Sequence, residues 1–255
     1  MREIRSKDNR IFKECQKLSQ KKYRDKEGLY LIEGENLIAE VPEQDLVYVF
    51  FREGQERQIF DLQDQYIVAE QLFDKLAQTE TSQGILAVVR KPNLTAEDLA
   101  ARIKDTDNVV VMDRLQDPGN IGTIIRTAEG AGYKAVITVK GTGDVFSPKT
   151  IRAAAGSVFR MPILQVEDNK ALRALTDKMG KKLVVTGFHT DKYYFDEDLS
   201  KGVALVIGNE GNGVSDELME MADVIVKIPM DGHLESLNAS VAAGILMYET
   251  KRKRD

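Results

Sequence analysis

Three segments of the chain place glycine, asparagine and a charged residue beside a short apolar run. They are Asp113–Arg126, Leu205–Ser215 and Ile228–Ala243. Loops of this kind expose backbone N–H and C=O groups that can bind a ligand. The three segments therefore predict a ligand-binding site. The simpler alternative is that each one is only a capped helix start or a flexible turn.

The first segment, DRLQDPGNIGTIIR, reads as a turn followed by a helix. Residues 117–119, Asp-Pro-Gly, are a turn signal, and Asn120 is expected to cap the helix that follows. Gly122 in the first helical turn allows close approach of another group. Arg126 comes six residues after Asn120, so its guanidinium can point to the same end of the sheet. The alternative is a capped helix with a surface arginine.

The second segment, LVIGNEGNGVS, is a glycine loop that follows an apolar strand. It contains Gly208, Gly211 and Gly213, with Glu210 among them. It matches neither G-x-G-x-x-G nor the phosphate-binding G-x-x-x-x-G-K-[ST]. Residues 141–143, Gly-Thr-Gly, also lack a third glycine. A nucleotide-dependent oxidoreductase is therefore disfavoured.

The third segment begins with a break in a strand and ends in a helix of small residues. Pro229 and Gly232 break the strand, and Ser236 and Asn238 stand where a helix starts. Their side chains can accept hydrogen bonds from unpaired N–H groups of the first turn. The small side chains that follow indicate close packing against another element; they are Ser240, Ala242, Ala243 and Gly244.

Other reactive residues give little support to a different chemistry. His189 and His233 are too far apart in sequence for a metal-ligand motif, so no metal site is predicted. The chain has no G-x-S-x-G, which leaves a hydrolase triad without support. The single cysteine, Cys15, excludes an internal disulfide framework and is expected in the core.

The second half of the chain, which contains these three segments, alternates short apolar strands with helices. Strands are expected at 109–112, 135–139, 183–186, 203–207 and 224–228, and helices at 121–131, 148–154, 170–179, 215–221 and 237–249. This alternation predicts an α/β fold with a parallel sheet that is covered on both faces. Such sheets bind ligands in the loops at the carboxyl ends of their strands.

The first 90 residues are predicted to form a separate, smaller α/β unit. Strands are expected at 29–32, 46–51, 66–69 and 85–89, and helices at 7–22, 35–41 and 71–77. In residues 7–22 an apolar face formed by Ile11, Phe12, Cys15 and Leu18 alternates with lysine and arginine. Residues 91–107 are interpreted as a linker with a short helix capped by Thr95, and residues 108–255 as the second domain.

The overall composition conceals a charge gradient. The 255 residues include 36 Lys and Arg against 41 Asp and Glu, yet residues 1–26 carry ten basic and four acidic side chains. This basic end, with KRKR at 251–254, hints at contact with a polyanion, and the alternative is a solvated helix face. The chain has no apolar leader and no apolar run long enough to span a bilayer. A cytoplasmic protein is therefore expected.

In order and spacing, the three segments resemble the motifs of the SpoU/TrmH-type RNA methyltransferases of the SPOUT superfamily. Motif one is similar to N-x-G-x-x-x-R, motif two to G-x-E-x-x-G-[LV]-S, and motif three to I-P-M-x-G-x-x-x-S-L-N-x-S-x-A. The motifs span about 150 residues. Tyr30–Val41 and Thr81–Val89 also resemble the small substrate-binding domain, of the ribosomal L30e-like type, that is often fused to this family. Ala239 stands where the family more often has Val.

The resemblance implies a C-terminal segment threaded into a deep trefoil knot, a homodimer formed across the knotted segments, and S-adenosylmethionine as cofactor. In the family pattern the Gly208–Gly211 loop and the Ile228–Met230 strand end hold adenine and ribose, and Leu237, Ala242 and Ala243 let the helix close over them. The implied cofactor contacts are Thr186, Gly187, Ile207, Gly208, Asn209, Glu210, Gly211, Ile228, Pro229, Met230, Ser236, Leu237, Asn238 and Ala243, and the implied catalytic residues are Asn120, Arg126, Glu210, Ser236 and Asn238.

The implied reaction moves a methyl group to a ribose 2′-hydroxyl of RNA, with ribosomal RNA favoured over tRNA. The family assigns proton removal to the arginine of motif one, here Arg126. An arginine is nearly always protonated, so a clamp on a neighbouring phosphate is the competing role. Two further alternatives are a tRNA 2′-O-methyltransferase and a non-catalytic RNA-binding protein on the same fold.

Overall fold

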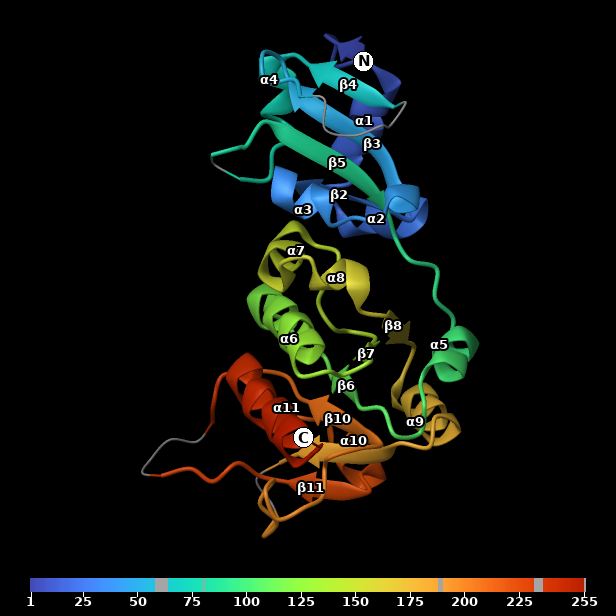
Figure 1. Cartoon of the computed structure of the whole chain (residues 1–255), viewed down its shortest axis with the longest axis vertical. Helices are drawn as coiled ribbons and strands as arrows, with labels where there is room; N and C mark the ends of the chain where they lie inside the picture. Colours follow the sequence, from blue (N-terminus) through green and yellow to red (C-terminus); the bar gives the residue numbers. More distant parts are fainter. Residues whose placement is uncertain (58–63, 80, 188–189, 232–235, 255) are drawn as a thin grey trace. The chain divides into compact units, whose positions relative to one another are not determined.

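The structure is a computed structural model that describes residues 1–57, 64–79, 81–187, 190–231 and 236–254. It divides into two compact units, Met1–Asn93 with Phe146–Ile151, and Leu94–Val145 with Arg152–Asp255. Each unit contains one sheet (Figure 1).

The first unit is a mixed five-stranded sheet with helices on its faces. The strands are β1 (Arg2–Ile4), β2 (Leu29–Glu33), β3 (Leu46–Arg52), β4 (Gln65–Val68) and β5 (Ile85–Arg90), in the order β1-β4-β3-β5-β2. The helices are α1 (Arg10–Lys17), α2 (Lys21–Glu27), α3 (Glu35–Ala39), α4 (Glu70–Phe73) and the 3-10 turn η1 (Glu43–Asp45). Strands β1, β4 and β3 run parallel, and β5 pairs antiparallel with both β3 and β2.

The predicted helix at 7–22 is wrong as a single element, because it is two helices with a break after Lys17. Asn9 caps α1 by accepting hydrogen bonds from the N–H groups of Ile11 and Phe12. Where α1 ends, Arg24 Nη1 donates to the carbonyl oxygen of Leu18 at 2.7 Å. The predicted apolar face is confirmed, since Phe12, Cys15 and Leu18 are buried in the core of this unit. Burial raises the pKa of the Cys15 thiol to about 12.

The second unit is built on a fully parallel six-stranded sheet in the order β11-β9-β10-β6-β7-β8. The strands are β6 (Val109–Met112), β7 (Ala135–Val139), β8 (Ile163–Val166), β9 (Lys182–Thr186), β10 (Val203–Ile207) and β11 (Val224–Val226). The helices are α5 (Ala96–Arg102), α6 (Pro118–Gly130), α8 (Ser157–Arg160), α9 (Asn169–Lys178), α10 (Asp216–Met221) and α11 (Ala239–Arg254). A further helix, α7 (Pro148–Ala154), begins in the first unit and ends in the second. The predicted parallel α/β fold is thus confirmed.

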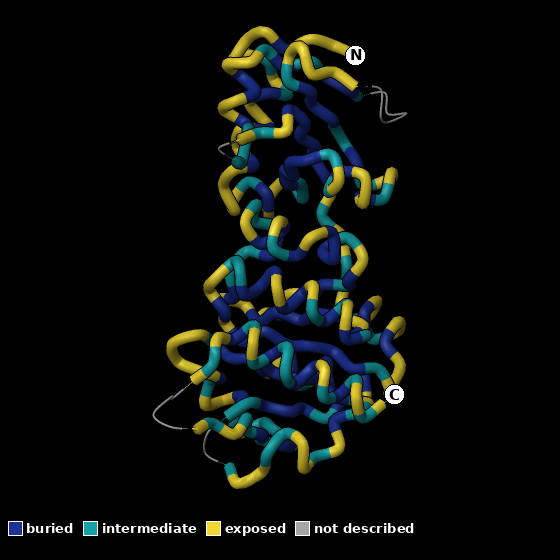
Figure 2. The backbone as a smooth tube through the Cα atoms, turned by 60° about the vertical axis from the view of Figure 1, so that its left-hand side comes forward, coloured by how far each residue is buried: buried dark blue, intermediate teal, exposed yellow. Residues whose placement is uncertain are grey.

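Helices cover both faces of this sheet, and its strands are buried (Figure 2). Alternate side chains of β6 and β10, such as Val111 and Val206, pack with Leu99 of α5, Leu172 of α9 and Leu218 of α10. The other face carries α6 and α11, which pack on each other. Burial on both faces explains why these strands are continuous apolar runs rather than alternating ones.

Most predicted elements are present with small shifts at their ends, and four short ones were missed. These are β1, η1, α8 and β8. In β1 only Ile4 is buried, and β8 is an edge strand in which Gln165 is exposed. Neither contains a long apolar run, so periodicity gives no signal. The short helix after the first sheet is confirmed as α5, which Thr95 and Asp98 cap reciprocally.

Candidate functional site

A cavity of about 290 Å³ lies at the carboxyl ends of β9, β10 and β11. Its walls come from these strand ends, the loop after β10 and the segment before α11. The lining residues are Thr186, Gly187, Ile207, Gly208, Asn209, Glu210, Gly211, Gly213, Val214, Val226, Lys227, Ile228, Met230, Ser236, Leu237, Ala239 and Ala242. The second and third sequence segments therefore meet at one pocket, as their positions after parallel strands predict.

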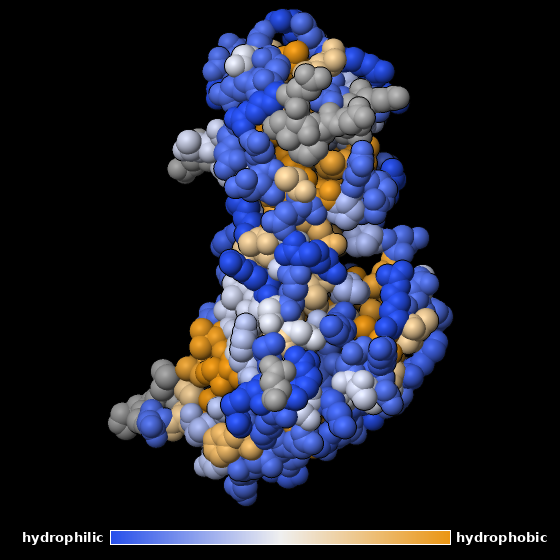
Figure 3. Space-filling view, in the orientation of Figure 1, coloured by the Kyte–Doolittle hydropathy of each residue, from blue (hydrophilic) through white to orange (hydrophobic). Residues whose placement is uncertain are grey.

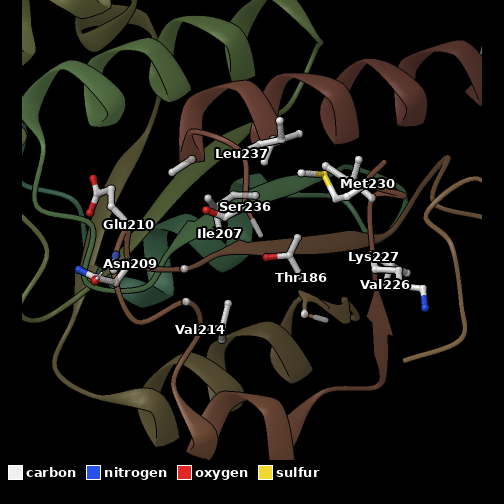
Figure 4. Close-up of a pocket in the computed structure, with 17 residues that line it drawn as sticks. Thr186, Ile207, Asn209, Glu210, Val214, Val226, Lys227, Met230, Ser236 and Leu237 are labelled. Carbon is white, nitrogen blue, oxygen red and sulfur yellow. Dashed lines mark hydrogen bonds between the residues drawn. The ribbon is translucent and has the colours of Figure 1, made fainter. Parts of the chain in front are cut away.

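The interior of the pocket is mainly apolar with polar groups at defined places (Figure 4). Ile207 and Ser236 lie at its centre, with Leu237 and Met230 on one side and Val214 on the other. The hydroxyl of Thr186 donates to the carbonyl oxygen of Val206 at 3.2 Å, which fixes that side chain to the sheet. An apolar pocket with a few oriented polar groups is typical of a small-molecule or cofactor site.

Unpaired backbone groups add hydrogen-bonding capacity to this pocket. The N–H groups of Ile228, Met230 and Leu237 make no hydrogen bond to any other described residue. Backbone N–H groups at a partly buried position normally have a partner, and these three can donate to a group bound in the pocket. The sequence prediction of recognition through backbone groups is consistent with this arrangement.

The loop after β10 is a closed turn that only glycine can begin. The N–H of Asn209 donates to the carbonyl oxygen of Gly213, and the N–H of Gly213 donates back to Asn209, both at 2.9 Å. A Cβ atom on Gly208 would lie 2.2 Å from the backbone nitrogen of Val214. Because backbone atoms cannot move aside cheaply, a side chain at this position would open the loop.

Glu210 joins this loop to the start of α6. Its carboxylate accepts hydrogen bonds from the N–H groups of Gln116 and Asp117, both at 3.0 Å, and from Asn120 Nδ2 at 3.1 Å. Burial alone would raise the pKa of Glu210, but these three donors outweigh it and hold the pKa below its usual value. Glu210 therefore stays ionised, and it fixes the loop after β6 against the loop after β10.

Asn120 continues the connection to the third segment. Its Oδ1 accepts a hydrogen bond from Asn238 Nδ2 at 2.9 Å, while Asn238 Oδ1 accepts from the N–H groups of Ser240 and Val241 and so caps α11. Residues from all three predicted segments thus form one hydrogen-bonded chain. The expectation that Asn120 caps α6 is wrong. Asp117 is the cap, and the Asn120 side chain instead bonds Glu210 and Asn238.

Arg126 lies outside this network. It is exposed on α6, and it makes no hydrogen bond or ion pair with any residue that the structure describes. Its guanidinium is available to a ligand. Ser236 lines the pocket but is exposed, and its hydroxyl accepts no capping hydrogen bond from an N–H of α11 within the described part of the chain.

Most of the predicted cofactor contacts line the cavity, and three do not. Pro229 is exposed, Asn238 faces Asn120, and Ala243 is fully buried within the packing of α11. The lining residues that sequence reasoning did not assign to the cofactor are Gly213, Val214, Val226, Lys227 and Ala239. A signal existed for two of them, because Val226 and Lys227 directly precede Ile228 at the end of a strand.

The predicted absence of metal chemistry is not decided by the structure. His189 and His233 lie outside the described residues. Among the residues that are described, no three His, Cys, Asp or Glu side chains form a group that can hold a metal ion. No helix in the described part of the chain is long and apolar enough to cross a membrane.

Comparison with known proteins places the chain in a family. Residues 107–248 match the SpoU rRNA Methylase family, and residues 9–87 match the MRM3-like substrate binding domain. The 23S rRNA (guanosine(2553)-2′-O)-methyltransferase RlmP of Bacillus subtilis (strain 168) is 37% identical over 258 residues, covering 98% of this chain and 100% of that protein. The chain belongs to the SpoU rRNA methylase family.

Solved structures agree with this assignment over nearly the whole chain. The SpoU methyltransferase AviRb from Streptomyces viridochromogenes, in complex with the cofactor AdoMet, has a TM-score of 0.88 at 29% identity and covers 96% of this chain and 98% of its own. An AdoMet-bound rRNA methyltransferase from Sinorhizobium meliloti has a TM-score of 0.86 at 28% identity, with 98% and 97% covered. The similarity thus includes both units.

Proposed function

We propose that this protein is an S-adenosylmethionine-dependent RNA 2′-O-ribose methyltransferase that acts on 23S ribosomal RNA in the cytoplasm. The observation that carries the proposal is the chain of hydrogen bonds from Glu210 through Asn120 to Asn238 beside the pocket. It unites the three family motifs at one site. The names of the full-length relatives support rRNA rather than tRNA as the substrate.

The residues of the pocket fit S-adenosylmethionine by their chemistry. Apolar side chains such as Ile207, Val214 and Leu237 suit a flat adenine ring. The N–H groups of Ile228, Met230 and Leu237, which have no partner among the described residues, suit its ring nitrogens and the ribose oxygens. When bound, the cofactor supplies an electrophilic methyl group on its sulfonium sulfur.

The protein then has to orient the RNA 2′-oxygen toward that methyl group and accommodate loss of its proton. Proximity and orientation provide a large part of the rate in such transfers. Glu210 is a poor proton acceptor, because three donors already occupy its carboxylate. We assign it, with Asn120 and Asn238, the task of holding the loops in place.

Arg126 is assigned to the RNA. Its exposed guanidinium presents several N–H donors that match the oxygens of a phosphate, so a clamp on the phosphate beside the target ribose is the role that we favour over general base. A phosphate clamp should still work when lysine, another cationic residue, replaces the arginine. A general base that depends on an unusual environment should not. Lysine and alanine at this position therefore separate the two roles.

The test is a methyl-transfer assay with purified 23S rRNA and tRNA, followed by mass spectrometry of 2′-O-methylnucleosides. We expect methylation of 23S rRNA, and we expect Arg126→Ala to lower kcat/KM about 100-fold, as loss of one charge-stabilising donor does. Arg126→Lys should retain part of the activity. Arg102→Ala, an exposed arginine at the end of α5, is the matched control and should be unaffected.

Three results would contradict this account. Full turnover by Arg126→Ala would remove its catalytic assignment. Equal losses with lysine and alanine would favour the general-base role. Methylation of tRNA alone would identify tRNA, rather than 23S rRNA, as the substrate. RNA binding without any S-adenosylmethionine binding in calorimetry would indicate a non-catalytic RNA-binding protein.

The proposal includes a homodimer formed through the C-terminal domain. Val241 and Tyr248 lie seven residues apart on α11, hence on one side of the helix, and are 50% and 51% exposed. Hydrophobic surface gathers over this helix (Figure 3). An exposed apolar helix face is typical of a subunit interface. The knot and the domain bounds 1–90, 91–107 and 108–255 stay predictions.

A further inference from the structure

A second cavity, of about 570 Å³, lies beside the cofactor pocket in the C-terminal unit. It is formed where the chain leaves two neighbouring strands in opposite directions, from β6 to α6 on one face of the sheet and from β10 to α10 on the other. Met112 and Ile207 are paired at the ends of these strands, so both loops begin at the same level. In open α/β sheets such a crevice is the preferred ligand position.

The two cavities share a wall, which places any ligand of the second one next to the reaction site. The loop residues Asn209, Gly213 and Val214 line both. Two of the polar side chains that line the second cavity already have protein partners: Asn209 donates to the carbonyl oxygen of Arg114, and Ser215 accepts from Asn169. The other polar side chains in its lining are those of Arg114, Gln116, Asn212 and Asp216. None of these four side chains lines the cofactor pocket.

Arg114 is held in a fixed position at this cavity. Its backbone has φ of 56°, a left-handed conformation that side-chain-bearing residues rarely adopt. Its Nε and Nη2 donate to Asp113, which is fully buried, at 3.0 and 3.3 Å. Asp113 is itself fixed by the N–H of Ser215 at 2.8 Å. The guanidinium is therefore oriented in advance, with Nη1 lacking a partner among the described residues.

The remaining side chains supply unpaired acceptors as well as donors. Gln116 Nε2 donates to the carbonyl oxygens of Arg114 and Gly141, which leaves its Oε1 without a partner in the described part of the chain. The side-chain amide of Asn212 and the carboxylate of Asp216 make no hydrogen bond to other described residues. The cavity thus presents one fixed cationic donor, one carboxylate and two amide groups.

This set of groups favours a nucleobase over a phosphate. The charge of Arg114 is already balanced by Asp113, and the carboxylate of Asp216 would repel a phosphate. Guanine offers two acceptors, O6 and N7, that a guanidinium recognises well. On its other edge guanine offers two donors, N1–H and the N2 amino group, to a carboxylate. No other RNA base has two acceptors on one edge and two donors on the other.

We propose that this cavity binds a guanine base of the RNA substrate, with Arg114 at O6 and N7 and Asp216 at N1–H and N2. The inference rests on the proposed function, because it takes RNA as the substrate. It assigns Arg114 and Asp216 to base recognition, separately from the residues that hold the cofactor.

The experiment measures binding of 5′-GMP, IMP, AMP, CMP and UMP to the full-length protein by ligand-observed NMR. IMP lacks only the N2 amino group, so GMP should bind at least about fivefold more tightly, the lower end of what one base-edge pair contributes. Asp216→Asn should abolish the difference between GMP and IMP, and Arg114→Gly should weaken both. Glycine suits the left-handed backbone, so this variant keeps the loop conformation.

Two matched variants control for charge and for backbone strain. Glu220→Gln removes another exposed carboxylate of α10, and Ala155→Gly relaxes the other described non-glycine residue with positive φ. Neither should change the GMP to IMP ratio. Equal binding of the five nucleotides, no binding at all, or an unchanged ratio in Asp216→Asn overturns the inference.

The outcome is independent of methyl transfer. If GMP binds selectively and no RNA is methylated, the proposed function fails and the guanine site stands. If 23S rRNA is methylated and Asp216→Asn and Arg114→Gly leave kcat/KM unchanged on it, the guanine site fails and the proposed function stands.

Discussion

At the scale of single residues, the most informative side chain is Glu210, an exposed carboxylate that works as a structural anchor. Its two oxygens accept three hydrogen bonds, two of them from the backbone of the loop after β6. Sequence reasoning placed it in the site but could not separate a proton acceptor from an anchor. The three donors identify it as an anchor, and they come from residues at least 90 positions earlier in the chain.

We predict that Glu210→Gln destabilises the folded protein at neutral pH. A glutamine amide would turn a donor toward N–H groups that need an acceptor. Because the residue is exposed and solvent screens it, we expect a loss of about 1 kcal/mol in the free energy of unfolding. The measurement is urea unfolding of both proteins across pH.

The stability difference between wild type and Glu210→Gln should depend on pH. The pKa of Glu210 is lowered by folding, so its contribution is complete above the unfolded pKa of about 4.3 and is lost as pH falls through the folded pKa. The gap between wild type and Glu210→Gln should therefore close in acid. Glu220→Gln is the control and should match wild type throughout. A gap that stayed constant from pH 7 into acid would mean that the carboxylate charge plays no part.

At the scale of elements, one side chain at the start of α11 has two separable functions. The oxygen and the nitrogen of the Asn238 side-chain amide each perform one of them. Asn238 Oδ1 caps the helix, and Asn238 Nδ2 donates to Asn120. Aspartate keeps the capping oxygen and replaces the donor with a second acceptor. Alanine removes both.

We predict that Asn238→Ala lowers stability by about 1 kcal/mol, the usual value of a helix cap. Asn238→Asp should keep the cap, yet its second carboxylate oxygen would face Asn120 Oδ1 and weaken cofactor binding. Thermal unfolding and S-adenosylmethionine calorimetry on the two variants distinguish these effects. If aspartate bound the cofactor as tightly as asparagine, the bond to Asn120 would be dispensable for the pocket.

Elements whose bounds follow a continuous apolar run could be predicted from the sequence. Elements that depend on a specific side-chain contact could not. The buried strands β6, β7 and β10 have the predicted bounds, because each is a continuous apolar run. At the break between α1 and α2, Arg24 donates to the carbonyl oxygen of Leu18, a contact that hydrophobic periodicity does not reveal.

The same reasoning applies to the candidate site. Cap chemistry identified Asn238 correctly, since its partners are two and three residues away. It failed at Asn120, whose partners Glu210 and Asn238 are about 90 and 118 positions distant. The second cavity was missed for a different reason, because Arg114 is fixed by a strained backbone and a buried neighbour, and neither belongs to a motif.

At the scale of the whole molecule, the structure revises the meaning of the basic N-terminus. Six of its ten basic side chains face a carboxylate; they are Arg2, Arg5, Arg10, Lys13, Lys21 and Lys26. Exposed pairs of this kind contribute little to stability, and they reduce the charge that is offered to RNA. Lys7, Lys17 and Lys22 are exposed and have no acidic partner among the described residues.

Lys17 and Lys22 share an aromatic neighbour, Tyr23. Their Nζ atoms lie 5.7 and 6.0 Å from its ring centroid. A cation beside a partly exposed ring is a combination that RNA-binding surfaces use for phosphate contact and base stacking. Residues 1–26 also supply β1 and the buried Phe12, so deleting them would damage the core of the first unit.

We therefore predict that the triple variant Lys7→Gln, Lys17→Gln, Lys22→Gln weakens RNA binding and lowers its salt dependence. If each lysine contacts one phosphate, the slope of log K against log salt should fall by about 2, since each contact contributes about 0.7 to 0.9. S-adenosylmethionine affinity should be unchanged, because these residues belong to the other unit. The measurement is RNA binding by fluorescence anisotropy at several salt concentrations.

A charge-matched control separates a specific surface from general attraction. Lys134, Lys178 and Lys201 are exposed lysines of the C-terminal unit, and their replacement by glutamine removes the same three charges. General attraction between the protein and a polyanion would lower the slope equally in both triple variants. A smaller slope in the N-terminal variant alone identifies the first unit as an RNA-binding surface. An unchanged slope there would show that the basic helices are only a solvated face.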